Sequence, residues 1–109
     1  MDFVEYPLLG NYHASELAFV FANQWPPVLH DFSARDKVVA AQFNGYWLNM
    51  AATGDPNTGG HSAGLLEYWP QYDTKADVNL LIEDPLSFEA GLDAAQCKVW
   101  DLVYETLQS

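Results

Sequence analysis

The feature that most limits how this sequence can fold is a long amphipathic helix in the middle of the chain. Its apolar stripe, at four-residue spacing, consists of Val39, Phe43, Trp47 and Ala51. Ser33, with Asp36 three positions later, predicts where the helix begins, because this pair can satisfy the free amides of a helix N-terminus. Gly54-Asp55-Pro56-Asn57 predicts its end, since glycine tolerates a left-handed cap and proline cannot continue a helix.

Shorter patterns predict the other elements. Residues 15–21 form an apolar segment that favours a short helix, and the double proline at Trp25-Pro26-Pro27 prevents any helix from continuing through it. Residues 76–82 alternate and then run apolar, which is typical of a strand. Residues 93–107 carry apolar side chains at helical spacing. We therefore expect a mainly helical chain with one short strand, and Trp47 and Trp100 in its core.

The charge balance excludes one class of partner. Four basic and fifteen acidic residues give a net charge of −11, whereas nucleic-acid binding needs clustered lysine and arginine. The acidic residues are scattered, as expected for a solvated surface. The longest apolar runs, such as residues 17–22, are far shorter than the ~20 residues that span a bilayer, so we expect no membrane span. The first six residues have no basic region and do not resemble a signal peptide.

His13 is the best candidate for a catalytic group. It follows Gly10 in a turn and precedes the apolar segment 15–21, an arrangement that often presents a general base. A histidine side chain, with its ordinary pKa near ~6.5, suits that role. Glu16 lies three residues further on, so the two side chains can share one face of a turn. Alternatively, Glu16 is an acidic residue favoured in the first turn of a helix by the helix dipole.

Four ordered blocks of sequence resemble one family. They are residues 10–21 around His13, residues 47–57 (WLNMAATGDPN), residues 69–73 (WPQYD) and residues 97–101 (CKVWD). In this order they resemble the C-terminal portion of the type-B carboxylesterase/lipase family, the cholinesterase-like branch of the α/β-hydrolases. The resemblance covers nearly all of residues 1–109, but that family's domain is several times longer.

The resemblance implies the fold and the chemistry. The fold is α/β, a mostly parallel sheet flanked by helices, of which this chain is the C-terminal part. The reaction is serine-dependent hydrolysis of a carboxylic ester without a cofactor, in which His13 is the general base and Glu16 a supporting acid behind it. The serine, the triad acid and the oxyanion hole belong to upstream parts of the family's domain, so we expect this chain alone to be inactive.

A second motif matches the sequence pattern around a nucleophilic serine by coincidence. Gly60-His61-Ser62-Ala63-Gly64 fits the G-x-S-x-G pattern, but a nucleophile elbow needs an apolar strand before the serine and a helix after it. Residues 55–59 have the composition of a loop, and Pro70 limits any helix that follows. Members of this fold also run serine, acid, histidine, whereas Ser62 comes after His13. We therefore interpret Ser62 as part of a variable loop.

The spacing of the histidines and of the single cysteine predicts no metal site. The three histidines have no paired spacing, so we expect no metal. Cys97 is the only cysteine and cannot form a disulfide within this chain. The resemblance implies a partner cysteine upstream, outside the sequence; the other reading is a buried free thiol on the terminal helix.

Two alternatives to an enzyme segment remain open. One alternative is that the chain is an inactive truncated product, and the other is that it is a non-catalytic binding or assembly module of the same family. Many family members are secreted, but the compartment of this chain is unknown. In either case the stripe along residues 39–51 is expected to find no sheet to cover it, which would favour self-association through exposed apolar helix faces.

Overall fold

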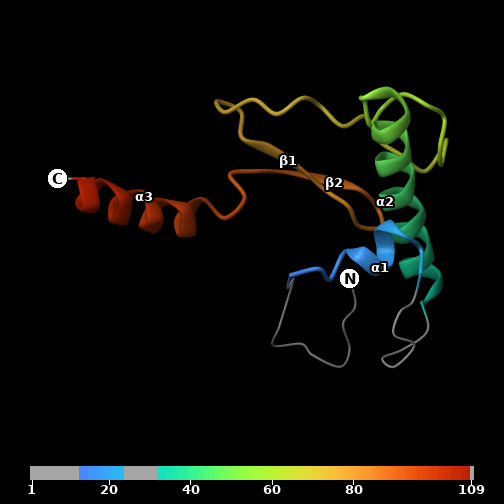
Figure 1. Cartoon of the computed structure of the whole chain (residues 1–109), viewed down its shortest axis with the longest axis horizontal. Helices are drawn as coiled ribbons and strands as arrows, with labels where there is room; N and C mark the ends of the chain where they lie inside the picture. The colour runs from blue at the N-terminus through green and yellow to red at the C-terminus, as the bar shows by residue number, and fades with distance from the viewer. Residues whose placement is uncertain (1–12, 24–31, 109) are drawn as a thin grey trace. The chain divides into compact units, whose positions relative to one another are not determined.

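The computed structural model describes residues 13–23 and 32–108. Within these residues the elements, labelled in Figure 1, are α1 (Leu17–Val20), α2 (Ala34–Thr53), β1 (Val78–Leu81), β2 (Ser87–Ala90) and α3 (Ala94–Gln108). The chain divides into two compact units, Met1–Trp69 with Ile82–Ser87 and Pro70–Leu81 with Phe88–Ser109. Helices α1 and α2 belong to the first unit, and α3 belongs to the second.

The ends of α2 are those predicted from the sequence. The hydroxyl of Ser33 accepts a hydrogen bond from the backbone amide of Asp36 at 3.1 Å, and the Asp36 carboxylate accepts one from the backbone amide of Ser33 at 2.9 Å. This reciprocal pair is a capping box. At the other end Gly54 adopts a left-handed φ of 79° and donates its amide to the carbonyl of Met50 at 2.8 Å. Both boundaries are confirmed.

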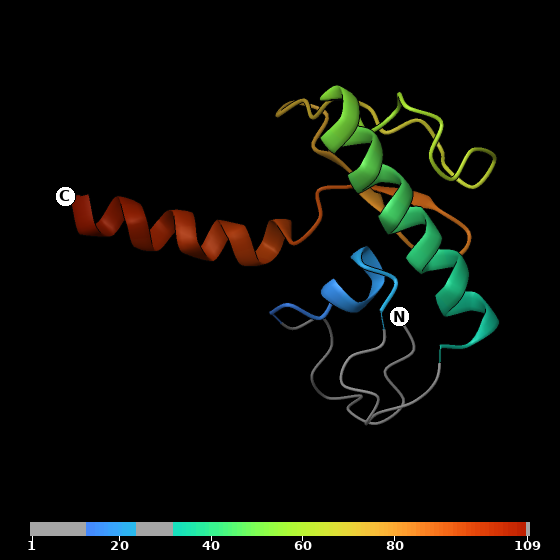
Figure 2. The same ribbon diagram turned by 45° about the vertical axis from the view of Figure 1, so that its right-hand side comes forward.

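The apolar core lies between α1 and the first half of α2, which lie side by side in Figures 1 and 2. Its buried residues are Phe19, Val20, Val39, Ala40 and Phe43. The ring of Phe19 stacks on Phe32 with centroids 4.9 Å apart and lies 6.1 Å from Phe43. Burial of these large side chains is worth about 1.5–3 kcal/mol each, which holds the four-residue α1 in place.

The prediction that the stripe of α2 would lie uncovered is wrong for its first half. Val39 and Phe43 are 3% and 8% exposed because Phe19 and Val20 of α1 pack over them. In the second half, Trp47 is 43% exposed and Ala51 is exposed. The short helix that follows His13 therefore covers part of the face that the sequence leaves without a partner.

Helix α1 is shorter than the predicted range of residues 15–21. Ala14 has a φ of 65° and Ala22 a φ of 49°, so the backbone is left-handed just outside each end of the helix. Glu16 is the N-cap residue, and its side chain makes no capping hydrogen bond. The helix consequently has one full turn, Leu17–Val20, flanked by turns at residues 13–16 and 21–22.

The loop after α2 is held to the helix by buried polar side chains. Asn49, 2% exposed, donates to the carbonyl of Pro56 at 3.0 Å and accepts from the backbone amide of His61 at 3.0 Å. The hydroxyl of Tyr46 donates to the carbonyl of Glu67 at 2.7 Å and accepts from its amide at 3.1 Å. Asn57 in turn bonds both backbone groups of Trp69. This loop is fixed along most of its length.

Strands β1 and β2 pair in a two-stranded sheet, whereas the sequence predicted one strand. Residues 82–86 join them, a connection too short for the crossover that a parallel pair would need. Strand β2 was not predicted, because Ser87–Ala90 is four residues long with only two apolar side chains and is too short for an alternating pattern to be recognised. Strand β1 and helix α3 confirm the elements predicted at residues 76–82 and 93–107.

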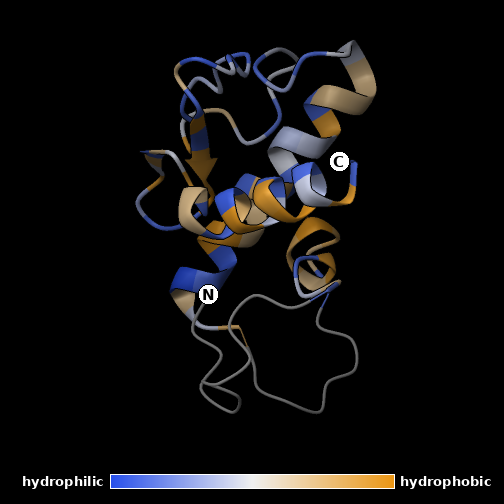
Figure 3. Cartoon of the chain, turned by 90° about the vertical axis from the view of Figure 1, so that its left-hand side faces the viewer, coloured by the Kyte–Doolittle hydropathy of each residue, from blue (hydrophilic) through white to orange (hydrophobic). Residues whose placement is uncertain are grey.

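Helix α3 has no buried residue. Trp100, expected in the core, is 71% exposed, and Leu107 is 81% exposed. Figure 3 shows hydrophobic (orange) and hydrophilic (blue) residues along this helix. Cys97 is also exposed, so the buried-thiol interpretation is wrong within the described part of the chain.

Candidate functional site

His13 lies exposed at the start of the turn that leads into α1. The amide of Leu17 bonds back to the carbonyl of Ala14 at 3.3 Å, and the carbonyl of Glu16 accepts the amides of Phe19 and Val20, both at 2.9 Å. These bonds fix the backbone immediately after the histidine. The imidazole itself has no hydrogen-bond partner among the described residues.

Glu16 shares this turn with His13 but is not joined to it. The residue is half-buried and serves as the N-cap position of α1. Within residues 13–23 and 32–108 no hydrogen bond or ion pair connects its carboxylate to the imidazole. The structure thus places the two predicted site residues in one turn without a hydrogen bond or ion pair between their side chains.

Asn44 ties the helix behind His13 to α2, and sequence reasoning missed it. Its amide nitrogen donates to the carbonyl of Val20, the last residue of α1, at 3.1 Å. Phe19 and Val20 are buried beside this bond, 4% and 6% exposed. The only sequence signal was a polar residue directly after Phe43 of the apolar stripe, and that signal does not identify a partner 24 residues away.

Ser62 has no nucleophilic geometry. Its hydroxyl donates to the carbonyl of Ala41 at 2.7 Å, which joins the loop to α2. Neither a strand before it nor a helix after it is present among the described residues between α2 and β1. Its φ of 53° and its close approach to Gly45, where an added Cβ would lie 2.6 Å from the Ser62 Cβ, belong to this packing. The features agree with a loop anchor.

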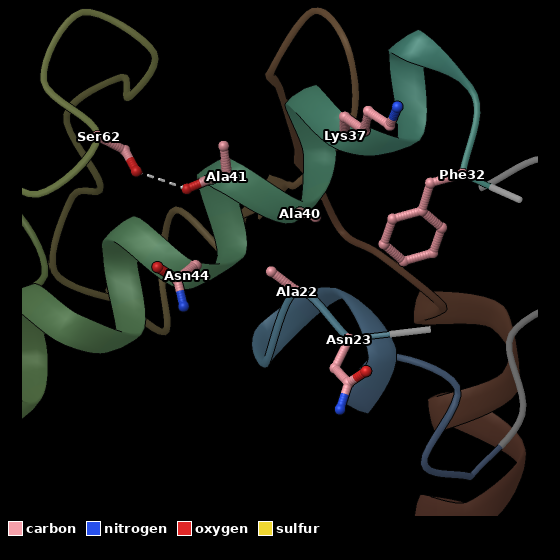
Figure 4. Close-up of a pocket in the computed structure, with 8 residues that line it drawn as sticks. All are labelled: Ala22, Asn23, Phe32, Lys37, Ala40, Ala41, Asn44 and Ser62. Carbon is pink, nitrogen blue, oxygen red and sulfur yellow. Dashed lines mark hydrogen bonds between the residues drawn. The ribbon is translucent and has the colours of Figure 1, made fainter. Parts of the chain in front are cut away.

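A cavity of about 600 Å³ lies beside α1 and α2 in the first unit. Figure 4 shows its lining residues, Ala22, Asn23, Phe32, Lys37, Ala40, Ala41, Asn44 and Ser62. Its volume falls within the ~300–1,000 Å³ of small-molecule sites. Neither His13 nor Glu16 lines it, so this cavity is distinct from the turn that carries the histidine.

Three shifted pKa values accompany hydrogen-bonded side chains. Burial raises the pKa of Tyr46, whose hydroxyl is bound to the backbone of Glu67. The backbone amide of Asn57 and the hydroxyl of Thr58 lower the pKa of Asp55. A hydrogen bond to the Asp77 carboxylate raises the pKa of Tyr72. None of these three interactions involves His13.

Metal-binding and membrane-spanning features are not found in the described part of the chain. No group of three or more histidine, cysteine or acidic side chains there could hold a metal ion. None of the helices in these ranges combines the length and apolar character needed to cross a bilayer.

The profile of the Carboxylesterase family matches residues 2–100. The chain belongs to this family. Bile salt-activated lipase of Bos taurus is 33% identical over 102 residues, which cover 91% of this chain and 17% of the relative. Acylcarnitine hydrolase of Rattus norvegicus is 31% identical over 88 residues, or 81% of this chain and 15% of the relative. Carboxylesterase 4A of Bos taurus is 36% identical over 63 residues. The chain spans less than a fifth of the length of each of these relatives.

Membership in the carboxylesterase family implies an α/β-hydrolase fold for the whole domain. This chain contributes a small, mainly helical piece with a two-stranded sheet. The four blocks that resemble the family lie in different places: at the turn before α1, across the end of α2, in the loop that Asn57 binds, and on α3.

Proposed function

We propose that this chain is the C-terminal part of a serine carboxylic-ester hydrolase and supplies His13 as its general base. The observation that carries the proposal is the exposed His13 in the turn before α1, in a chain whose residues 2–100 match the carboxylesterase family. The names of its relatives, a lipase, an acylcarnitine hydrolase and a carboxylesterase, favour an ester as the substrate class.

In the acylation half of the proposed reaction, His13 takes a proton from the serine and then gives it to the leaving alcohol. The serine hydroxyl, from another part of the domain, attacks the ester carbonyl carbon while the imidazole takes its proton. Collapse of the tetrahedral intermediate breaks the ester bond, and the imidazolium gives the proton to the departing alcohol. Water then attacks the acyl-enzyme by the same route in reverse, releasing the carboxylic acid and restoring the serine. An upstream acid orients the imidazole, and backbone amides stabilise the oxyanion.

The packing of α1 supports this role. A general base must be held to well under an ångström, and three residues separate His13 from a helix that Phe19, Val20 and the Asn44 bond hold on α2. Glu16, half-buried in the same turn, is proposed to support the imidazole electrostatically in the complete domain.

The test is a chimaera in which this chain replaces the matching stretch of bovine bile salt-activated lipase. The chimaera should hydrolyse a short-chain aryl ester, and the isolated chain should not. His13→Ala should lower kcat by several orders of magnitude with the fold intact by circular dichroism, and Glu16→Gln by about 10- to 100-fold.

His61→Ala is the matched control, because His61 is also exposed but lies in the loop anchored by Asn49. It should leave turnover within a factor of two or so. A folded chimaera without activity, or equal and small effects of His13→Ala and His61→Ala, would contradict the proposal.

A second candidate, a non-catalytic assembly module, has one observation in its favour. Helix α3 carries Trp100, Val103, Tyr104 and Leu107 at i, i+3, i+4 and i+7 spacing, and all four are exposed. This face would let copies of the chain associate, whether or not His13 is catalytic.

A further inference from the structure

The residues that line the cavity beside α1 and α2 differ in chemistry from one end to the other. Figure 4 shows Lys37 and Phe32 toward one end, Asn44 and Ser62 toward the other, and Ala40 and Ala41 between them. Lys37 and Asn44 are seven residues apart on α2, which at ~1.5 Å per residue corresponds to about 10 Å.

Lys37 supplies the positive charge at one end of the cavity. Lys37 is one of four basic residues in a chain of net charge −11, and its ammonium has no hydrogen-bond or ion-pair partner among the described residues. The nearby charged groups are already engaged: Arg35 donates to the carbonyl of Asp84, and the Asp36 carboxylate caps α2. An anion beside Lys37 would therefore displace none of the contacts that join the described residues.

The middle of the cavity is apolar. Ala22, Ala40 and Ala41 present methyl groups there, and the ring of Phe32, at the Lys37 end, is held in place by stacking on Phe19. At the far end one amide hydrogen of Asn44 is bound to Val20 and the hydroxyl hydrogen of Ser62 is bound to Ala41. Their oxygens keep lone pairs that can accept a hydrogen bond from a hydroxyl.

We propose that this cavity binds an amphiphilic carboxylate about 10 Å long, with its carboxylate at Lys37 and its aliphatic body across Phe32 and the alanines. A hydroxyl at the distal end would strengthen binding through Asn44 and Ser62. This site is separate from His13 and is measured by binding alone, so it stands or falls independently of the proposed hydrolase function.

The test is a titration of the chain with sodium octanoate, followed by nuclear magnetic resonance. Amide shifts should change at Lys37, Ala41, Asn44 and Ser62 and stay unchanged on α3, where exposed apolar residues could otherwise bind the probe. Lys37→Gln should weaken binding at least ~10-fold and Lys37→Arg should restore most of it, because only the arginine keeps the charge.

Two further measurements separate the cavity from general hydrophobic attraction. Ala41→Leu should weaken octanoate binding by filling the cavity, and 8-hydroxyoctanoate should bind more tightly than octanoate. Octylammonium should bind weakly, since its charge is repelled by Lys37. Equal binding of octylammonium and octanoate, no change in affinity with Lys37→Gln, shifts confined to α3, or no shifts in the folded chain at millimolar octanoate would each overturn the proposal.

Discussion

Asn49 holds the long loop against α2. Its amide group donates to Pro56 and accepts from His61, so both halves of a buried side chain are satisfied by backbone that lies 7 and 12 residues away. Buried polar groups that lose such partners cost more than the bond itself, because both remaining groups stay buried and unbonded.

Asn49→Ala should lower the free energy of unfolding by about 2–3 kcal/mol in urea denaturation. Asn23→Ala is the matched control, because Asn23 is exposed and has no side-chain partner among the described residues; its effect should stay within about 0.5 kcal/mol. If the two variants were equally stable, the Asn49 bonds would contribute nothing to the fold.

Ionisation of Asp55 makes the stability of the chain depend on pH. Its folded pKa is lowered, first by the Asn57 amide and then by the Thr58 hydroxyl, relative to an ordinary value of 3.8. The ionised form is therefore favoured by folding. This contribution is fully present above the unfolded pKa and is lost as the pH falls through the lower folded pKa.

Asp55→Asn should remove that dependence, because an amide cannot ionise. The melting temperature of the native chain should exceed that of Asp55→Asn at pH 6, and the difference should shrink as the pH is lowered through and below 3.8. A difference that persisted unchanged to pH 2 would mean that the Asp55 hydrogen bonds, and not its charge, stabilise the turn.

At the residue scale, the sequence predicted what is local. The Ser33–Asp36 capping box and the Gly54 cap are set by residues within four positions of each other, and both were predicted. Asn44, Asn49 and Tyr46 bond to backbone 7 to 24 residues away, and no periodicity shows which distant carbonyl a polar side chain will meet. Whether His13 and Glu16 act as proposed stays a prediction.

At the scale of elements, the loop that carries Ser62 and helix α2 meet at a glycine. Gly45 is buried mid-helix, where alanine would ordinarily be preferred by up to ~1 kcal/mol. The Ser62 Cβ and hydroxyl occupy the space that an alanine methyl would need, at 2.6 and 2.7 Å. The close approach outweighs helix propensity here.

Gly45→Ala should therefore destabilise the chain by about 1–3 kcal/mol despite the better helix former. Adding Ser62→Gly should recover most of the loss, since it removes the clashing Cβ and the φ of 53° at position 62 suits glycine. The measurement is a double-mutant cycle by thermal denaturation. Additive losses in the double variant would show that the two residues do not compete for space.

The elements themselves were predictable to different degrees. Helices α2 and α3 are long and strongly periodic, and their ranges were confirmed almost to the residue. Helix α1 is one turn long, and left-handed backbone at Ala14 and Ala22 lies within three residues of its ends, a conformation that the residue type does not indicate. Strand β2 exists because β1 pairs with it, so its own four residues held too little information.

At the scale of the whole molecule, apolar surface is distributed unevenly between the two units. The first unit contains the buried core, whereas every described residue of α3 is unburied. The sequence predicted an exposed apolar face along α2, of which only the second half is exposed, and it did not predict the exposed face of α3, because periodicity identifies an apolar face without identifying what packs on it. Helix α1 packs on the first half of the α2 stripe, whereas every described residue of α3 stays unburied.

The chain should self-associate through α3. Leu107→Glu should shift sedimentation toward the monomer, whereas Gln108→Glu, its neighbour outside the stripe with the same added charge, should not. Association should increase with salt, because the net charge of −11 makes copies repel one another. A chain that stays monomeric at high salt, or that responds equally to both substitutions, would contradict this expectation.

The contacts that hold α1 on α2 have a consequence for the order of folding. The Asn44–Val20 bond spans 24 residues, and the buried partners of Phe19 in the core, Val39, Ala40 and Phe43, lie at similar or smaller separations, whereas Ile82 packs on this core from much further along the chain. Closing so short a loop costs little chain entropy, and contacts of low sequence separation form early. Most contacts of the segment that follows His13 can therefore form once α2 has left the ribosome, before α3 emerges, and the Ile82 contact is added later.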